Sequence, residues 1–161
     1  MQIRHTRPED LPAMQEIFAD ARAFMRENGN PDQWGDRFPT REMLDKDLAL
    51  HRSYVCEDNG KIAATFAFTT DGEPTYRVIR GGAWLDDAPY GVVHRIAAAK
   101  GTHGAASFWC MEQCGNIRID THANNKPMQG LLNKLGYTYC GVIELENGRG
   151  ERLAFQKRVE K

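Results

Sequence analysis

The chain has 161 residues, 41% of them hydrophobic, a composition that suits one compact domain over residues 1–161 and excludes a disordered chain. Its formal net charge of −1 gives no electrostatic reason to expect nucleic acid or an anionic membrane as a partner. No apolar run is long enough to span a bilayer, and residues 1–5 do not read as a signal peptide, so we expect a soluble cytoplasmic protein.

The N-terminal half predicts a strand, two helices and a hairpin. Thr6 begins a capping-box pattern with Pro8 in the first helical turn. The Asn59-Gly60 pair between two strand-like runs is typical of a β-hairpin. The expected elements are strands at residues 3–6, 54–58 and 61–69, and helices at 6–28 and 40–50.

The C-terminal half predicts alternating strands and helices. Asn124 or Asn125 caps a helix with Pro127 in its first turn, and Gly136 ends it. The expected elements are strands at residues 76–79, 91–97, 117–121, 137–144 and 151–158, and helices at 104–114 and 125–135. The whole order favours an α/β fold, with a mixed sheet and helices on its faces. The four cysteines lack metal-ligand spacing, so we expect free thiols and no metal site.

Residues 92–107 carry the most informative pattern, in which a strand is followed by a loop of small residues and the start of a helix. Small residues such as Gly101, Gly104 and Ala106 allow several main-chain N–H groups to converge, and the helix start adds a positive dipole end. Such a turn binds phosphate or pyrophosphate, although an ordinary strand-to-helix turn also requires small residues.

Two segments make the chain resemble the GNAT superfamily of acyl-CoA-dependent N-acetyltransferases. Residues 101–106 resemble the family's acyl-CoA loop, Arg/Gln-x-x-Gly-x-Gly/Ala, with Gly104 and Ala106 matching and Gly101 in place of the leading Arg or Gln. Residues 125–137 resemble the family's second motif. They match it at Leu131, Lys134, Gly136 and Tyr137, with Leu132 where many members carry a tyrosine.

The resemblance implies a mostly antiparallel sheet of about six to seven strands with about four helices, in which the fourth and fifth strands splay apart. The acyl-pantetheine arm of acetyl-CoA would lie in that gap as an added strand. The residues that the resemblance assigns to this cosubstrate are His94, Arg95, Ile96, Thr102, His103, Gly104, Ala105, Ala106, Ser107 and Asn125.

The implied reaction is acetyl transfer from acetyl-CoA to a primary amine of a small molecule or peptide, by direct attack in a ternary complex. The amine must be neutral to attack, so a general base is needed. The candidates are His122, Asp120 and His94. Asp120 and His122 are two residues apart on a strand and so share a face, where the carboxylate would raise the pKa of the histidine. A purely structural role, with no part in catalysis, is the alternative interpretation of either histidine.

The acceptor side is expected to involve Trp34 and Phe38 as an apolar wall, with Glu73 and Tyr76 closing the other side. Two other functions stay open. One is a catalytically silent domain that binds acyl-CoA as a sensor, because the usual tyrosine is replaced by Leu132. The other is an α/β protein for a different nucleotide. A homodimer through the terminal strand, residues 152–158, is a further possibility by analogy.

Overall fold

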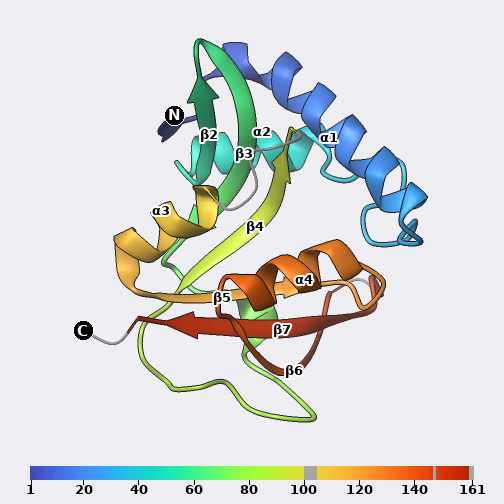
Figure 1. Ribbon diagram of the computed structural model, residues 1–161, viewed down its shortest axis with the longest axis vertical. Helices are drawn as coiled ribbons and strands as arrows, with labels where there is room; N and C mark the ends of the chain where they lie inside the picture. The colour runs from blue at the N-terminus through green and yellow to red at the C-terminus, as the bar shows by residue number, and fades with distance from the viewer. Residues whose placement is uncertain (100–104, 147, 160–161) are drawn as a thin grey trace.

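The protein is described by a computed structural model over residues 1–99, 105–146 and 148–159 (Figure 1). Its strands are β1 (Gln2–His5), β2 (Ser53–Asp58), β3 (Lys61–Thr69), β4 (Gly91–Ala98), β5 (Asn116–Thr121), β6 (Thr138–Glu144) and β7 (Glu151–Arg158). Its α-helices are α1 (Leu11–Glu27), α2 (Arg41–Ala49), α3 (Ala105–Cys114) and α4 (Lys126–Lys134), with short 3-10 helices η1 (Pro8–Asp10) and η2 (Pro74–Tyr76).

The described strands form one seven-stranded sheet in the order β1-β2-β3-β4-β5-β7-β6. Within it, β4 and β5 pair in parallel and the other neighbours are antiparallel, which confirms the mixed, mostly antiparallel sheet. The edges of the described sheet are β1 and β6. The idea that the terminal strand offers a free edge for dimerisation is therefore wrong, because β7 is paired with β5 on one side and β6 on the other.

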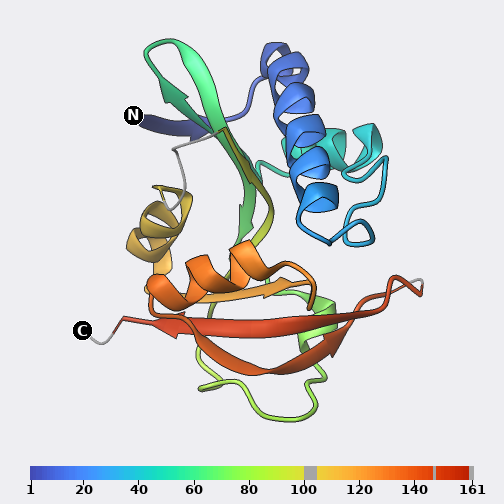
Figure 2. The ribbon, with the colours of Figure 1, turned by 45° about the vertical axis from the view of Figure 1, so that its right-hand side comes forward.

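Helices cover both faces of the sheet (Figure 2). On one face, apolar side chains of α1 and α2 pack on Val55 and Ala97. On the opposite face, Cys56 and Ile117 belong to a second core cluster, beneath α3 and α4. Adjacent residues such as Val55 and Cys56 thus point into different cores, as the two-residue period of a strand requires. A third cluster around Tyr76 lies under the segment between β3 and β4.

The segment between β3 and β4 differs from its prediction as a partial strand at residues 76–79. The structure has the short helix η2 there, with Pro74 in its first turn, and the pairing that follows is a single bridge between Arg80 and Val142. Gly82 then passes so close to β6 that an added Cβ would lie 2.0 Å from the carbonyl oxygen of Cys140. Burial of the Tyr76 side chain, which is 1% exposed, outweighs the strand propensity of this segment.

The start of the first helix also differs in detail. The hydroxyl of Thr6 bonds that of Ser53 at 2.7 Å, and the capping carboxylate belongs to Asp10, which accepts from the main-chain N–H of Arg7 at 2.7 Å. Arg4 forms an ion pair with the same carboxylate. This pair and the hydrogen bond from the Arg7 main chain hold the pKa of Asp10 below its usual value. At the other end, α1 ends before Asn28-Gly29 as expected. None of the described helices is both long enough and apolar enough to cross a membrane.

Candidate active site

The sheet opens between β4 and β5. These two strands pair only at Gly91 with Ile117 and at Val92 with Arg118. Past that point β4 continues beside β3, and β5 continues beside β7, so the facing edges of β4 and β5 have no ladder partner in the described chain. Figure 1 shows β4 rising away from β5, and the expected splay is confirmed.

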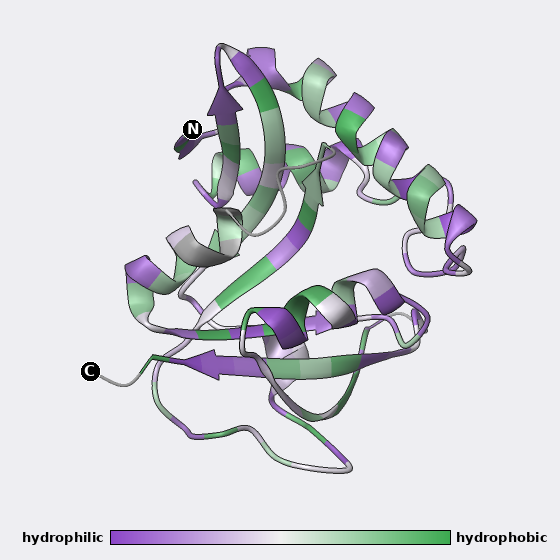
Figure 3. Cartoon of the chain, in the orientation of Figure 1, coloured by the Kyte–Doolittle hydropathy of each residue, from purple (hydrophilic) through white to green (hydrophobic). Residues whose placement is uncertain are grey.

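A bulge bends β4 at the opening. Thr65 pairs with Ala97 and Ala67 with His94, so β4 carries one more residue than β3 in this stretch. Arg95 takes the extra position with φ of +51°, in the left-handed region that non-glycine residues rarely adopt. Its guanidinium pairs with both oxygens of the buried Asp47 carboxylate, at 2.7 and 2.8 Å, and this contact ties α2 to the bulge. Figure 3 shows the same place as a hydrophilic interruption in the middle of an otherwise mostly apolar strand.

A cavity of about 660 Å³ occupies the opening. Its walls come from both faces of the sheet: from α1, α2 and the loop between them on one side, and from α4 on the other. The described lining includes the expected residues Trp34, Phe38, Glu73, His94, Arg95, Ile96, Asp120 and Asn125. Neither His122 nor Tyr76 lines it.

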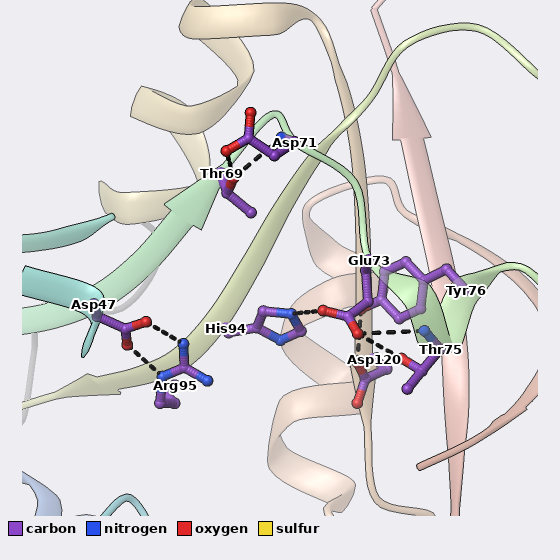
Figure 4. A network of polar contacts seen from close by, with 9 residues as sticks. All are labelled: Asp47, Thr69, Asp71, Glu73, Thr75, Tyr76, His94, Arg95 and Asp120. Atoms are coloured by element: carbon purple, nitrogen blue, oxygen red, sulfur yellow. Dashed lines mark hydrogen bonds and ion pairs between the residues drawn. The ribbon is translucent and has the colours of Figure 1, made fainter. Parts of the chain in front are cut away.

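His94 and Glu73 form a pair on the wall of this cavity (Figure 4). The Nε2 atom of His94 lies 2.9 Å from Oε2 of Glu73. The other carboxylate oxygen accepts from the Thr75 main-chain N–H at 3.3 Å and from its hydroxyl at 3.0 Å. The neighbouring His94 lowers the pKa of Glu73 to about 2, against the cost of burial. Glu73 therefore stays ionised and fixes the imidazole in place, with Nδ1 making no hydrogen bond to a described residue.

A hydrogen bond from Tyr76 fixes the position of the Asp120 carboxylate. The Tyr76 hydroxyl donates to Oδ2 of Asp120 at 2.6 Å, and the Trp84 indole donates to the Tyr76 carbonyl at 2.9 Å. Burial raises the pKa of Tyr76 well above its usual value, so this hydroxyl remains a donor. Tyr76 was expected to wall the acceptor pocket; it lies beneath Asp120 instead and positions that carboxylate.

His122 lies apart from this group. β5 ends at Thr121, and His122 Nδ1 accepts the main-chain N–H of Asn124 at 3.0 Å, in the turn that leads to α4. The expectation that Asp120 raises its pKa is wrong. Burial lowers the pKa of His122, and Arg152 lowers it further. No hydrogen bond joins Asp120 to His122 among the described residues, because the strand that would align them has already ended.

Asn125 is the cap of α4, as one of the two predicted asparagines. Its Oδ1 accepts from the Met128 main-chain N–H at 3.1 Å, and its Nδ2 donates to Gln33 Oε1 at 2.9 Å. Gln33 also accepts from Asn30 Nδ2 at 2.8 Å. The sequence interpretation did not include Gln33, Arg149 or Arg152, although all three line the cavity. Nothing in the local sequence around the two arginines marks them as cavity residues.

The residues predicted to bind the cosubstrate fall into two groups. Thr102, His103 and Gly104 lie outside the described residues, as does Gly101. α3 begins at Ala105 and includes Ala106 and Ser107, so main-chain N–H groups of its first turn lie at the positive end of the helix dipole. The Ala106 side chain is buried in the core.

The substitution Glu73→Gln tests the His94–Glu73 pair through stability. A carboxyl whose pKa falls from 4.5 to about 2 on folding stabilises the protein above pH 4.5, and that stabilisation is lost between pH 4.5 and 2. Because both side chains are partly exposed, we expect the variant to be less stable at pH 6 by about 1–2 kcal/mol, with the difference vanishing by pH 2. Denaturant unfolding at several pH values measures this. Asp71→Asn removes an exposed carboxylate of the same cavity and is the matched control. An equal loss at every pH in Glu73→Gln would contradict the pairing.

The chain is similar along its whole length to solved acetyltransferase structures. No family model and no curated protein matches the sequence. A Streptococcus agalactiae acetyltransferase of the GNAT family is 34% identical, covers 99% of this chain and 96% of its own, and has a TM-score of 0.86. A Listeria monocytogenes acetyltransferase of the GNAT family shares 17% identity, over 98% of this chain and 94% of its own, with a TM-score of 0.68. A Salmonella typhimurium protein solved with its cofactor acetyl-CoA shares 17% identity over 100% and 95%, with a TM-score of 0.57. At 17% identity the last two show a shared fold alone, whereas 34% identity over nearly the whole of both chains shows that the first is homologous.

Proposed function

This chain belongs to the GNAT family of acetyltransferases, and from that premise we propose that it transfers the acetyl group of acetyl-CoA to a primary amine by direct attack in a ternary complex. The observation that carries the proposal is the cavity between β4 and β5, with His94, Glu73 and Asp120 on its wall. The Salmonella typhimurium protein of the same fold, solved with acetyl-CoA, supports the choice of cosubstrate.

The described residues fit an acyl-CoA in two respects. First, the unpaired edge of β4 at residues 94–96 presents main-chain groups to an extended pantetheine arm, which would take the place of a missing strand. The Arg95 side chain is occupied by Asp47, so its contribution would come from the main chain. Second, α3 begins at Ala105, and the N–H groups of its first turn have no partner within the helix and lie at its positive dipole end, which suits a pyrophosphate. Residues 102–107 are the proposed binding segment.

The chemistry requires a neutral amine. We assign His94 as the base that takes a proton from the acceptor ammonium, because Glu73 orients its ring in the cavity. Asp120 provides a negative charge that favours binding of the ammonium form. Attack then forms the C–N bond and breaks the C–S bond, the amide nitrogen loses a second proton, and the departing thiolate takes up one. One proton is released overall.

The family's usual tyrosine does not supply that thiolate proton here. Leu132 stands in its place, 2% exposed in the core cluster with Tyr137 and Phe155. Because Leu132 cannot donate a proton, we assign that step too to the His94–Glu73 pair, whose imidazole carries the proton taken from the amine.

Incubation with acetyl-CoA and a panel of primary amines tests the function. We expect release of free CoA thiol, with formation of the acetylated amine by mass spectrometry and a rate that saturates in both substrates. Calorimetry measures acetyl-CoA binding separately. Binding without thiol release for any amine would contradict catalysis and favour an acyl-CoA-binding module. A thermal shift with ATP or NAD but not with CoA would contradict the cosubstrate itself.

A further inference from the structure

Several charged side chains on the cavity wall have no ion-pair partner among the described residues. Arg52 pairs with Asp71 at 3.0 Å, and Arg95 pairs with Asp47. Glu73 is held by His94, and Asp120 accepts from Tyr76. Among the lining residues, Lys46, Arg149 and Arg152 remain without an ion pair to any described carboxylate within 4.0 Å, and the Glu146 carboxylate pairs with no described cation.

Arg152 is a buried cation held by dipoles alone. It is 4% exposed, and its guanidinium donates to the carbonyls of Arg149 at 3.3 Å, Glu151 at 2.8 Å and Gln33 at 3.3 Å. Carbonyl dipoles satisfy its N–H groups but bring no counter-charge, and burial lowers its pKa accordingly. A buried guanidinium without a carboxylate partner lowers the stability of the fold, and a bound anion at the cavity wall would compensate its charge.

Arg149 adds a second unneutralised cation on the same wall. Its guanidinium lies 4.1 Å from the centre of the Phe38 ring, so an aromatic face holds it in place of a carboxylate. Unlike Arg152, Arg149 is exposed, yet partial loss of hydration around its guanidinium lowers its pKa, and the charge of Arg95 acts in the same direction. Asp120 opposes the shift in both Arg149 and Arg152, so its carboxylate shares their electrostatic surroundings without pairing with them.

Thr121 is an independent sign of a missing polar partner. It lines the cavity next to Asp120, it is 1% exposed, and its hydroxyl has no hydrogen-bond partner among the described residues. A buried hydroxyl without a partner is destabilising, and a bound polar group would supply the missing hydrogen bond. The cavity therefore contains an amine-attracting carboxylate, two guanidinium groups without a described carboxylate partner, and a hydroxyl without a described hydrogen-bond partner.

We propose that the acceptor is an amine that also carries a carboxylate, as a free amino acid does, and that Arg149 and Arg152 bind that carboxylate while the amine faces Asp120 and His94. The inference rests on the proposed acetyl transfer and narrows its substrate class. Polyamines and simple alkylamines lack the anion, and additional cationic groups would be repelled by the two arginines.

Matched amine pairs test the proposal. L-phenylalanine is compared with 2-phenylethylamine, and L-leucine with 3-methylbutylamine, by thiol release from acetyl-CoA. We expect kcat/KM at least tenfold higher for the amino acids, and Arg149→Gln to reduce that preference at least tenfold, mainly through KM. Arg77→Gln, an exposed arginine outside the cavity, is the control and should keep the preference. Arg152→Lys, which retains the charge but not the fork, should fold and weaken it.

Calorimetry with the same four compounds and CoA separates failure of the inference from failure of the function. If no amine is acetylated, tighter binding of the amino acids than of the matched amines, lost in Arg149→Gln, still supports the anion site. Equal or better use, or equal binding, of the amines that lack a carboxylate would overturn it, as would an unchanged preference in Arg149→Gln.

Discussion

Replacement of His94 by alanine should lower kcat for acetyl transfer by about a hundredfold to ten-thousandfold, the range typical of losing a general base. The acceptor ammonium would then have to lose its proton to water, while the lone pair needed for attack stays occupied. The dissociation constant of acetyl-CoA should change by less than about threefold, because β4 offers its main chain and not this imidazole to the pantetheine arm.

The pH dependence distinguishes a base from a structural residue. If His94 accepts the proton, the wild-type pH–rate profile has an ascending limb, and His94→Ala loses that limb. The remaining activity should then increase with hydroxide or with added small bases such as imidazole. Retention of both the rate and the limb in His94→Ala would contradict the assignment.

His122→Ala is the matched control, since it removes an imidazole that lies close in sequence to Asp120 but does not line the cavity. We expect its rate to stay within about threefold of the wild type, with a loss of stability of about 1 kcal/mol from the broken bond to the Asn124 N–H. If this variant loses the rate and His94→Ala keeps it, the order of the two candidates is reversed.

The sequence predicted those parts of the fold that depend on local signals. The Asn59-Gly60 hairpin and the Asn125 cap with Pro127 appear where expected, because turn and cap geometry is decided by a few adjacent residues. Residues 76–79 were misassigned because the Tyr76 ring is buried by distant strands, a tertiary effect that no local window contains.

The sequence predicted several residues of the candidate site but not which of them contact one another. Glu73 and His94 were both named, yet they are 21 positions apart and their 2.9 Å contact depends on how η2 folds against β4. Asp120 and His122 were paired by strand parity, an argument that fails once the strand ends at Thr121. Arg149 and Arg152 resemble surface charges in sequence. Their positions at the cavity depend on contacts with residues far away in the chain, since Arg149 packs on Phe38 and Arg152 donates to the Gln33 carbonyl.

Replacement of Gly104 by glutamate should weaken acetyl-CoA binding by at least about a hundredfold. The residue belongs to the proposed pyrophosphate segment, directly before α3, and the change adds bulk and a negative charge next to the phosphates. Two like unit charges about 4 Å apart at an effective dielectric constant of about 20 repel by about 4 kcal/mol, more than the roughly 2.7 kcal/mol that a hundredfold loss requires. Part of this repulsion is screened by salt, so the loss should shrink as ionic strength rises.

Gly130→Glu provides the matched control, with the same change of residue at an exposed position of α4 where an added Cβ meets no atom within 4 Å. It should leave acetyl-CoA binding within about twofold, because its charge lies outside the cavity lining. Gly130→Glu should unfold cooperatively near the wild-type temperature, since Gly130 belongs to no described core cluster, and thermal unfolding of Gly104→Glu checks that this variant is folded. Calorimetric titration with acetyl-CoA measures the outcome. Wild-type affinity in Gly104→Glu would mean that main-chain amides of residues 102–107 do not hold the diphosphate, and the acyl-CoA site would have to be sought elsewhere in the chain.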